Sequence, residues 1–436
     1  MRLAVIGTGH VGLVTAATLA KIGHQVSGLD HDPAKIEPLS RGESPFFEPG
    51  LQELLDSVLS TGRLTFTADA QEAIAGADLA MICVGTPSGP EGEANLRAVE
   101  RAAEDIAKNA TGNMIVVQKS TVPVETAEIL EKRIFNRDSD FEFLLVSNPE
   151  FLREGSAVED SLKPDRILVG TDSPEAHAAM RELYAPLIGD DTKYFAVDVR
   201  TAELAKHACN AFLALKISYA NALAQICEAA GADVVTVADI MGADDRIGRA
   251  FLNAGLGYGG YCFPKDVEAF KFQASKLGYD FRLLDEVVAI NESALASAYA
   301  KIQDAVWNVD DKRIVLFGLS FKPDTDDVRQ SPALALAKML VAAGAEVVGY
   351  DPQANDAAKK AVAELVTYED PYEAAEGAHC IVISTDWAEF ADLDLVRLKG
   401  IVAHPTIVDA RNIFDPSVME EAGFTYLPTG RPRINT

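Results

Sequence analysis

The sequence predicts an α/β protein with two doubly wound domains joined by a long central helix. Three observations support this prediction. The first third of the chain alternates short apolar runs with helical patterns, the last third repeats that order, and an alanine- and leucine-rich stretch without proline lies between them. At 436 residues, with 48% hydrophobic and 24% charged residues, the chain is long enough for several buried cores. We expect domains at residues 1–198, 199–300 and 301–436.

The charge of the chain excludes several classes of partner. The formal net charge is −27 at pH 7, so we expect neither a nucleic-acid partner nor binding to an anionic membrane surface. A phosphorylated ligand must then be bound by local basic residues or by helix N-termini. No uncharged apolar run reaches the roughly 18 residues of a membrane helix.

The five cysteines are scattered along the chain, and their number is odd. This pattern is typical neither of a disulfide framework nor of a zinc site, and it favours a reducing, cytoplasmic compartment and no bound metal. The chain begins with a strand-like run that leads into a glycine-rich loop, which is unlike a signal peptide. The cysteines are Cys83, Cys209, Cys227, Cys262 and Cys380.

The first third contains four apolar runs of strand length and one clear helical pattern. We expect strands at residues 3–6, 25–29, 79–84 and 114–117, and a helix over residues 11–22. Strands that alternate with helices in this way predict a parallel sheet with crossover helices.

A glycine motif, Gly7-x-Gly9-x-x-Gly12, lies between the first strand and the first helix. In Rossmann-like domains the three glycines allow a tight turn, close approach of a pyrophosphate and close packing of the helix. Asp30 ends the second strand, where a carboxylate can bind the adenosine ribose and repel a 2′-phosphate. The motif therefore predicts an NAD site and favours NAD over NADP. The alternative is a tight turn that binds nothing.

Polar residues follow two further strands of the predicted sheet. Thr86 comes after the strand that ends near residue 84, and Thr121 follows the next strand. The carboxyl ends of strands are where open α/β sheets bind ligands, so both are candidate site residues. Each could instead belong only to a turn at the end of a strand.

Two glutamates lie four residues apart in the segment 147–155. If a helical turn runs through this segment, Glu150 and Glu154 share a face, where paired carboxylates raise each other's pKa and suit proton transfer. A solvated acidic turn is the alternative.

Residues 201–231 are rich in alanine and leucine and lack proline, which predicts a long, largely buried helix of the kind that forms dimer cores. Lys206 and Asn210 lie one helical turn apart, and Asn221 lies at a similar angle. On an apolar helix such groups need partners, so they are candidate ligands for an oxyanion. A lysine that only extends its amine to solvent is the alternative. Two neighbours, His207 and Cys209, are interpreted as packing residues.

Cys262 lies in the glycine-rich run Gly257-Tyr258-Gly259-Gly260-Tyr261-Cys262-Phe263-Pro264-Lys265-Asp266. The glycines allow the backbone to approach a ligand closely, and the nearby Lys265 favours a reactive thiolate. A thiol in such a loop, in a chain with a nucleotide motif, suggests covalent capture of a substrate carbonyl. The other four cysteines are interpreted as buried and inert.

The last third predicts a second nucleotide-type domain. We expect strands at residues 312–317, 347–351, 380–383 and 406–409, and a helix over residues 333–343. The first loop of this domain, residues 318–324, lacks the three-glycine motif, so a different nucleotide, held partly by Lys322, is expected. A degenerate structural repeat is the alternative.

These motifs resemble those of one family over nearly the whole chain, the UDP-glucose/GDP-mannose dehydrogenases. The resemblance rests on the N-terminal glycine motif, Asn148-Pro149-Glu150-Phe151, Cys262-Phe263-Pro264-Lys265-Asp266 and Phe321-Lys322-Pro323-Asp324-Thr325, in the family's order and spacing. Phe-Pro-Lys-Asp after the cysteine is similar to the members that oxidise UDP-glucose. Tyr261 departs from the smaller residue that is commoner before the cysteine.

The resemblance implies a four-electron oxidation of UDP-glucose to UDP-glucuronate, a step of polysaccharide biosynthesis. Two NAD molecules accept a hydride each, and Cys262 carries the carbon first as a thiohemiacetal and then as a thioester that water hydrolyses. It implies that Lys206 and Asn210 stabilise an oxyanion, that Asp266 and Thr121 hold or activate a water, and that Glu150 and Glu154 support proton transfer and hydrolysis. A cytoplasmic homodimer is expected.

The resemblance also assigns binding residues to this sequence. Those expected at the cofactor are Gly7, Gly9, His10, Val11, Gly12, Asp30, Lys35, Thr86, Thr121, Glu154, Lys265 and Arg329. Those expected at the UDP-sugar are Glu150, Phe151, Leu152, Lys206, Asn210, Arg246, Phe251, Leu252, Asn253, Gly257, Tyr258, Gly259, Phe321, Lys322 and Arg411, with Arg246 reaching across a dimer interface.

Three alternatives stay open at the level of sequence. The substrate could be another nucleotide sugar, such as UDP-N-acetylmannosamine or GDP-mannose. A two-electron dehydrogenase would share the NAD site but would not need Cys262. A non-catalytic nucleotide-sugar sensor would keep both nucleotide loops and tolerate loss of the thiol.

Overall fold

The computed structural model describes residues 1–136 and 140–435, which form two compact units. Unit 1 comprises Met1–Cys209 and Glu268–Tyr279, and unit 2 comprises Asn210–Val267 and the described residues from Asp280 onward. Helices α9 (Val199–Ala230) and α11 (Cys262–Lys276) contribute residues to both units. Each unit is built around a sheet of its own.

The described sheet of unit 1 has the strand order β3-β2-β1-β4-β5-β6-β7-β8. Its first six strands have the order of a doubly wound, nucleotide-binding sheet, as the sequence predicts. The strands are β1 (Arg2–Ile6), β2 (Gln25–Leu29), β3 (Leu64–Thr67), β4 (Leu79–Ile82), β5 (Met114–Gln118), β6 (Phe143–Ser147), β7 (Arg166–Gly170) and β8 (Lys193–Val197). The predicted strands are confirmed to within about two residues at each end.

The sheet of unit 1 differs from the expected all-parallel arrangement at one pair. β6 and β7 pair only through their last residues, Ser147 and Gly170, and in the antiparallel sense. β7 and β8 are parallel to each other. The apolar pattern that predicts a strand carries no information on its direction, so the sequence could not predict that β6 and β7 are antiparallel.

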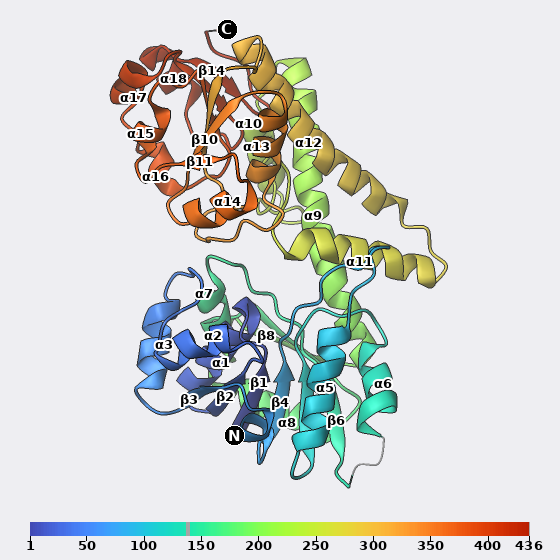
Figure 1. The fold of residues 1–436 in the computed structure, drawn as a ribbon. Helices are drawn as coiled ribbons and strands as arrows, with labels where there is room; N and C mark the ends of the chain where they lie inside the picture. Colours follow the sequence, from blue (N-terminus) through green and yellow to red (C-terminus); the bar gives the residue numbers. More distant parts are fainter. Residues whose placement is uncertain (137–139, 436) are drawn as a thin grey trace. The chain divides into compact units, whose positions relative to one another are not determined.

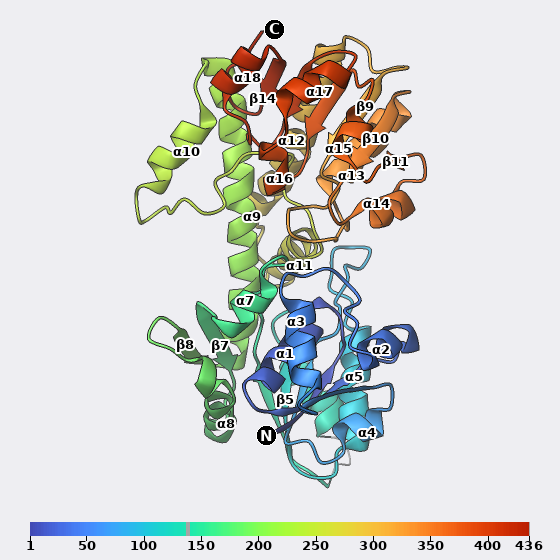
Figure 2. The same ribbon diagram turned by 90° about the vertical axis from the view of Figure 1, so that its left-hand side faces the viewer.

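Alternate residues of the strands in unit 1 belong to two separate cores. Leu3 and Val5 of β1 pack in one buried cluster with helices α1, α3, α7 and α8, and Ala4 and Ile6 pack in another with α4, α5 and α6. This alternation is the two-residue period of a strand buried on both faces. Figures 1 and 2 show helices covering both faces of this sheet. The helices of unit 1 are α1 (His10–Lys21), α2 (Pro33–Ser40), α3 (Leu51–Leu59), α4 (Ala70–Ile74), α5 (Arg97–Asn109), α6 (Thr126–Leu130), η1 (Glu131–Phe135), α7 (Ala157–Leu162), α8 (Pro174–Tyr184) and η2 (Ala185–Leu187).

The described sheet of unit 2 repeats the same topology in six parallel strands, with the order β11-β10-β9-β12-β13-β14. The second α/β domain predicted from the sequence is therefore confirmed. The strands are β9 (Arg313–Phe317), β10 (Glu346–Tyr350), β11 (Val366–Thr367), β12 (Cys380–Ile383), β13 (Thr406–Asp409) and β14 (Thr425–Pro428). The helices are α10 (Val234–Gly242), α12 (Arg282–Val306), α13 (Pro332–Ala342), α14 (Asn355–Ala361), α15 (Pro371–Ala375), α16 (Ala388–Ala391), α17 (Leu395–Ile401) and α18 (Pro416–Ala422).

The long helix expected at residues 201–231 is confirmed as α9, whose 32 residues are the most of any described helix. Within the described residues, no helix has both the length and the apolar composition needed to cross a membrane. Nor do any three histidine, cysteine, aspartate or glutamate side chains of that part of the chain lie as a cluster able to hold a metal ion.

A buried cation connects three segments of unit 2. Lys301 of α12 is 5% exposed, pairs with Glu228 of α9, and donates a hydrogen bond of 3.0 Å to the Pro428 carbonyl. Glu228 also accepts the Gly430 amide proton at 2.7 Å. Because burial is unfavourable for a charged amine, it lowers the pKa of Lys301, and the Glu228 partner opposes this.

We expect Lys301→Met to lower the free energy of unfolding by about 3 kcal/mol, because it breaks a buried ion pair and leaves Glu228 and the Pro428 carbonyl without the amine. A matched control is Arg433→Met, since Arg433 pairs with Asp304 on the surface of the same unit. The control should change the unfolding free energy by less than about 1 kcal/mol. Urea denaturation followed by circular dichroism measures both, and equal effects would contradict the prediction.

Candidate active site

The three glycines of the N-terminal motif have different physical roles. Gly7 has φ +99°, and a Cβ there would lie 2.7 Å from the Cys83 carbonyl oxygen. A Cβ on Gly12 would lie 1.9 Å from the Gly7 oxygen. A Cβ on Gly9 would meet no atom within 4 Å, and Gly9 is exposed at the N-terminus of α1. The fold therefore requires Gly7 and Gly12, whereas Gly9 leaves open space where a pyrophosphate can approach a helix N-terminus.

Asp30 follows β2 at the same edge of the sheet. Its carboxylate accepts hydrogen bonds of 3.0 Å from the Thr8 amide and hydroxyl and pairs with Lys35 at 3.1 Å. Burial raises the pKa of Asp30, but the hydrogen bonds from the Thr8 and Asp32 amides and from Lys35 outweigh it and bring the pKa below its ordinary value. An ionised acceptor at this place suits the ribose hydroxyls of NAD, and the expected Lys35 lies beside it.

Glu48 is a buried residue near the glycine motif that the sequence analysis did not identify. Its Oε2 lies 2.8 Å from His10 Nε2, in the first turn of α1, and accepts the Gly155 amide proton at 2.8 Å. Its Oε1 accepts the Ala157 amide proton at 2.8 Å. Glu48 therefore ties the cofactor loop to the segment that carries Glu154. In the sequence it stands in a Phe-Glu-Pro-Gly turn, which gives no signal of contacts more than 100 residues away.

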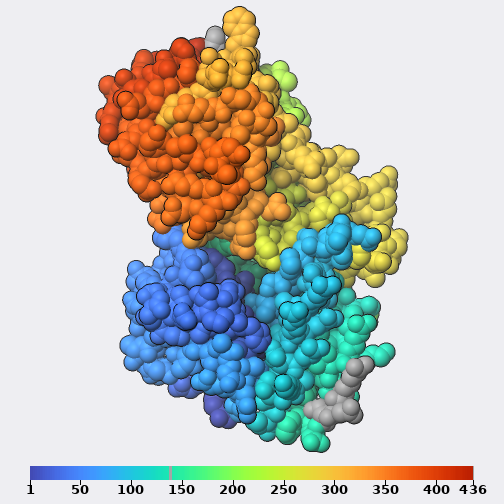
Figure 3. Space-filling view, in the orientation of Figure 1, coloured from blue at the N-terminus to red at the C-terminus, as the bar shows by residue number. Residues whose placement is uncertain are grey.

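The two predicted threonines at the strand ends lie together. The Thr86 hydroxyl donates a hydrogen bond of 2.9 Å to the Thr121 carbonyl oxygen. Thr86 is buried at the base of the segment between β4 and α5, whose residues Ser88 and Pro90 are exposed; Figure 3 shows this segment in light blue at the surface. The carboxyl ends of β4 and β5 are adjacent in the sheet, which explains the contact.

The expected helical turn through Glu150 and Glu154 is absent, so the inference that they share a helical face is wrong. Residues 148–153 are irregular, and a turn at 154–155 precedes α7. Pro149 cannot donate a backbone hydrogen bond, and Glu150 Oε2 accepts the Leu152 amide proton at 2.5 Å, which favours a local turn over a helix.

Glu150 is paired with Lys206 rather than solvated. Glu150 Oε1 lies 3.1 Å from Lys206 Nζ, and the two residues are 7% and 4% exposed. The alternatives of a solvated acidic turn and of a lysine extended to solvent are therefore both wrong. The Phe151 ring lies against two cations, with Arg166 Cζ 3.9 Å and Lys206 Nζ 5.3 Å from its centre. Leu152 is half-buried beside it.

Cys262 is the first residue of α11 and is half-buried. The positive end of the helix dipole favours a thiolate at that position, which adds to the argument made from Lys265. Of the four cysteines interpreted as buried and inert, Cys83, Cys227 and Cys380 are buried, whereas Cys209 is half-buried. Burial raises the pKa of Cys83 and of Cys380 to about 12, and it raises the pKa of Cys227 as well.

Asp266 lies one turn after Cys262 in α11 and is 1% exposed. It accepts a hydrogen bond of 2.6 Å from Asn210 Nδ2 and pairs with Lys265 Nζ at 2.5 Å. The Tyr261 ring, directly before the cysteine, contacts two cations, with the Lys265 amine 5.3 Å and the Arg329 guanidinium carbon 4.5 Å from its centre. Unit 2 thus brings four of the predicted residues, and Tyr261, around the start of α11.

The glycines of the loop before Cys262 are needed for packing against the protein itself. Gly260 has φ +78°, and a Cβ there would lie 2.6 Å from the Phe321 ring. A Cβ on Gly259 would lie 2.3 Å from the Gln330 carbonyl oxygen. The expectation that these glycines serve contact with a ligand is therefore incomplete, because protein atoms already occupy that space.

Two asparagines hold the same loop by its backbone. Asn291 of α12 accepts the Tyr258 amide proton at 2.7 Å and donates to the Tyr258 carbonyl at 3.1 Å. Asn221 of α9 accepts the Gly255 amide proton at 2.7 Å. Asn291 was not identified from the sequence, where a single asparagine in the middle of a helix gives no sign of such a contact.

Arg411 and Lys322, two of the predicted basic residues of unit 2, both lower the pKa of the Asp386 carboxyl group. Arg411 pairs with Asp386 at 2.5 Å. Burial raises the pKa of Asp386, but the Arg411 and Lys322 cations outweigh it and hold the pKa below its ordinary value. Arg411 also packs on the Phe251–Gly257 loop, since its Nη1 would lie 2.7 Å from a Cβ on Gly255. This cluster of positive charge beside a glycine-containing loop suits a diphosphate.

The other predicted UDP-sugar residues in and near the Phe251–Gly257 loop each make contacts of their own. Phe251 and Tyr258 both pack on the Phe263 ring, with ring centres 6.1 and 6.2 Å away. Leu252 is buried, and Asn253 accepts a hydrogen bond of 2.7 Å from Arg249. Arg246 pairs with its neighbour Asp244, and its side chain is 88% exposed.

The acid after β10, Asp351, corresponds in topology to Asp30, but the protein itself uses its hydrogen-bonding capacity. Asp351 Oδ2 accepts the Leu319 amide proton at 2.7 Å, the Ser320 amide proton at 3.0 Å and the Trp387 indole proton at 3.1 Å. Asp351 is 1% exposed, so its carboxylate is less accessible to a ligand than that of Asp30, whose side chain is 12% exposed.

Comparison with known proteins agrees with a nucleotide site at the glycine motif of unit 1 and a diphosphate site near Arg411 in unit 2. The chain matches the UDP-glucose/GDP-mannose dehydrogenase family in its NAD binding domain over residues 1–188, its central domain over 200–293 and its UDP binding domain over 315–416. A "UDP-glucose 6-dehydrogenase" of Rhizobium meliloti is 44% identical, covering 99% of this chain and 100% of that protein. One of Pseudomonas aeruginosa is 42% identical over 99% and 98%.

Solved structures show the same relationship. A UDP-glucose dehydrogenase of Pyrobaculum islandicum has 36% identity and a TM-score of 0.91, covering 99% of this chain and 98% of its own. A UDP-D-ManNAc dehydrogenase of Pyrococcus horikoshii has 29% identity and a TM-score of 0.87, covering 99% of both chains.

A pair of glycine substitutions separates the cofactor site from the fold. We expect Gly9→Ala to leave the melting temperature nearly unchanged but to raise the Kd for NAD at least about tenfold, because the methyl group enters the open space. Gly12→Ala should instead lower the free energy of unfolding by about 3 kcal/mol, because its Cβ overlaps the Gly7 oxygen. Calorimetry gives both quantities, and unchanged NAD binding by Gly9→Ala would contradict the assignment.

Proposed function

Because this chain belongs to the UDP-glucose/GDP-mannose dehydrogenase family, we propose that it oxidises UDP-glucose to UDP-glucuronate with two molecules of NAD. The overall change is UDP-glucose, water and two NAD⁺ to UDP-glucuronate, two NADH and three protons, so four electrons leave one carbon. The greater similarity to relatives named for UDP-glucose than to the structure named for UDP-D-ManNAc supports this choice of sugar.

The observation that carries the proposal is Cys262 at the first position of α11, beside the buried Asp266. A second oxidation at the same carbon needs the aldehyde to be held in a form that can lose another hydride. A thiolate supplies this by addition to the carbonyl carbon. A simple alcohol dehydrogenase needs no thiol at such a place.

In the first oxidation, C6 loses a hydride and its hydroxyl loses a proton, and we assign to Glu150 and Glu154 the transfer of that proton to solvent. NAD, when bound, accepts the hydride of each oxidation. Lys206 carries the positive charge that stabilises the oxygen as it becomes negative, and Asn210 donates an amide hydrogen bond to the same oxygen. Glu150 orients the Lys206 amine through their contact at 3.1 Å. Because Glu150 already holds the Lys206 amine in place, little reorganisation of this group is needed in the transition state.

In the second oxidation, the Cys262 sulfur forms a bond to C6 of the aldehyde, and the oxygen becomes the hydroxyl of a thiohemiacetal. Loss of the second hydride and of a proton gives a thioester. Water then attacks the carbonyl carbon, the carbon–sulfur bond breaks, and the thiolate is released with UDP-glucuronate. We assign to Asp266 and Thr121 the holding and activation of that water, and to Glu150 and Glu154 the transfer of its protons.

The binding residues are proposed as follows. The uridine diphosphate and glucose contact the Phe251–Gly257 loop, Tyr258, Gly259 and the basic residues of unit 2, and the sugar also contacts the segment from Glu150 to Leu152. The proposed basic residues are Lys322 and Arg411, together with Arg246 of a second subunit. The cofactor contacts are proposed for Gly7, Gly9, His10, Val11, Gly12, Asp30, Lys35, Thr86, Thr121, Glu154, Lys265 and Arg329.

We also propose the domain boundaries 1–198, 199–300 and 301–436, which the extents of the three family matches support. A cytoplasmic location is proposed from the cysteines, which are all free thiols in the described chain. A homodimer is proposed from α9, whose Phe212 and Ile226 are 61% and 62% exposed and, with Tyr219, repeat every seven residues along one side of the helix.

The covalent step predicts a defined effect of Cys262→Ser. Wild-type protein should form two NADH for each UDP-glucose consumed. The variant cannot form a thioester, so its steady-state NADH formation should fall by a factor on the order of 10³, while the Kd for UDP-glucose stays within about twofold. Absorbance at the NADH band and isothermal titration calorimetry measure the two quantities.

Cys209→Ser is the matched control, because Cys209 is a half-buried cysteine without an assigned role. It should retain wild-type NADH formation. A wild-type yield of one NADH per sugar, or unchanged turnover in Cys262→Ser, would eliminate the covalent mechanism. A clear preference for another UDP- or GDP-sugar in a substrate panel would overturn the choice of UDP-glucose.

The exposed side of α9 predicts a change of oligomeric state. We expect Phe212→Glu combined with Ile226→Glu to convert a dimer into a monomer of 46.7 kDa, because four buried carboxylates at such an interface are unfavourable. Val396→Glu is the control, since Val396 of α17 is also an exposed apolar residue, 83% exposed. Sedimentation velocity measures the mass, and a wild-type monomer would contradict the proposal.

A further inference from the structure

Glu203 of α9 holds the backbone of the loop that follows β5 in unit 1. Glu203 Oε2 accepts the Glu125 amide proton at 2.8 Å, and its Oε1 accepts the Ala127 amide proton at 3.0 Å. The residue is 2% exposed. Both of its carboxylate oxygens are thus engaged at the point where the loop enters α6.

His207, one turn further along α9, holds the same loop at a second point. Its Nε2 lies 2.9 Å from the Val122 carbonyl oxygen, and because a carbonyl only accepts, this nitrogen carries the proton and donates. His207 is 1% exposed, and its ring stacks on Phe270 with the centres 5.9 Å apart. The loop is therefore tied to α9 immediately after Thr121 and again at Glu125.

Lys206 lies between these two residues in the chain and is bound to Glu150 at 3.1 Å. One turn of α9 thus contacts both the loop that carries Thr121 and the loop that carries Glu150. In the proposed reaction both loops supply groups whose distances from Lys206 determine the rate, and a displacement of about 1 Å can cost a large factor.

We propose that Glu203 and His207 are positioning residues of this reaction, which hold the Thr121 loop in a fixed place relative to Lys206. Neither is assigned contact with substrate or cofactor. The inference rests on the proposed function, because it concerns the rate of that reaction.

The charge on Glu203 provides a way to test its role. Burial raises the pKa of Glu203 from 4.5 to about 7, although the hydrogen bonds from Ala127 and Glu125 oppose this. The ionised carboxylate accepts both amide protons, whereas the protonated acid has one strong acceptor left. The loop is therefore held by two full hydrogen bonds only above about pH 7.

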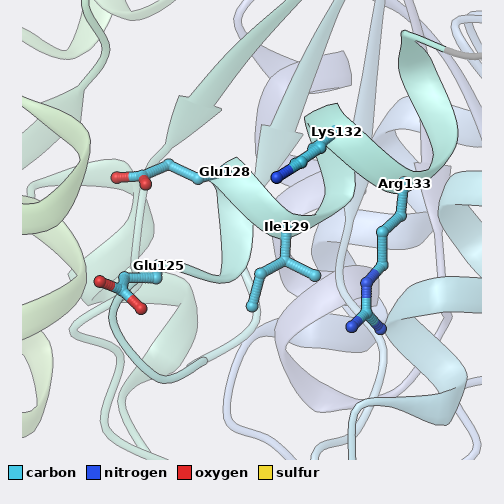
Figure 4. Close-up of a pocket in the computed structure, with 5 residues that line it drawn as sticks. All are labelled: Glu125, Glu128, Ile129, Lys132 and Arg133. Carbon is cyan, nitrogen blue, oxygen red and sulfur yellow. The ribbon is translucent and has the colours of Figure 1, made fainter.

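The charges that shift the pKa of Glu203, those of Glu128 and Arg200, lie at the surface. Arg200, also on α9, pairs with Glu125 at 3.3 Å and with Glu128 at 2.5 Å. Figure 4 shows Glu125 and Glu128 pointing to the same side of α6, where they line a surface pocket of about 450 Å³ with Ile129, Lys132 and Arg133. Of these charges, Glu128 raises the pKa of Glu203 and Arg200 lowers it.

The pKa shift has opposite consequences for stability and for loop placement. Because the folded-state pKa of Glu203 is raised, its stabilising contribution is fully present below about pH 4.5 and is lost as the pH rises through about 7. Placement of the loop improves over the same interval, because the second hydrogen bond forms. A residue that only stabilised the fold would give no gain in rate as the pH rises.

The test is the ratio of kcat for wild type to kcat for Glu203→Gln as a function of pH. Glutamine has one acceptor oxygen and cannot ionise, so it represents the protonated form over the whole range. We expect a ratio near one at about pH 6 that rises to about tenfold above about pH 8, with its midpoint near pH 7. Taking the ratio removes the titrations that both proteins share, such as that of the catalytic thiol.

Glu128→Gln, on α6, is the matched control. It removes a surface carboxylate but leaves both hydrogen bonds of Glu203, so the rise of kcat with pH should remain. The midpoint of that rise should move to lower pH, because Glu128 raises the pKa of Glu203. His207→Gln, whose amide can still donate to the Val122 carbonyl, should retain more activity than His207→Ala, with the KM for UDP-glucose unchanged in both.

A ratio that stays constant from about pH 6 to about pH 9 would overturn the inference, because Glu203 would then act only as a structural residue. Equal losses in His207→Gln and His207→Ala would do the same for His207. Failure of the proposed function is a different result, since wild type would then form no NADH from UDP-glucose at any pH.

Discussion

The buried ion pair between Lys206 and Glu150 is the constraint on which the candidate site of unit 1 depends. A lysine that is 4% exposed is costly unless it has a partner, so the loop after β6 must lie against α9. The same requirement applies to Glu203, which is satisfied by amides of the loop after β5. The polar residues of one helical turn thus determine where two strand-end loops lie.

The glycines illustrate how one residue type serves different physical needs. Gly12 is required because the helix approaches the Gly7 carbonyl, and Gly260 is required because Phe321 lies where a side chain would be. Gly9 is required by neither, and its open surroundings suit a ligand. In the sequence all three positions are simply glycines. The contacts that a Cβ would make at each position distinguish their roles.

The strands and helices were largely predictable from the sequence because their signals are local. Apolar runs defined β2, β12 and β13 with their observed bounds, and a proline-free stretch defined α9. The irregular path of residues 148–153 was not predictable, because it depends on contacts of Glu150 with the neighbouring Leu152 amide and with the distant Lys206. Nor was the role of Glu48, whose partners lie more than 100 residues away.

The sequence by itself determined the two α/β domains and the cofactor loop and led to the proposal of a reactive thiol at Cys262, because each is encoded in short runs of residues whose chemistry is local. Only the tertiary structure decided which charges pair. Lys206 meets Glu150 and Asn210 meets Asp266 across 56 residues of chain in each case, with a different segment brought to α9. Such contacts depend on strand order and loop path, which arise from the packing of the whole unit and leave no pattern in any short segment.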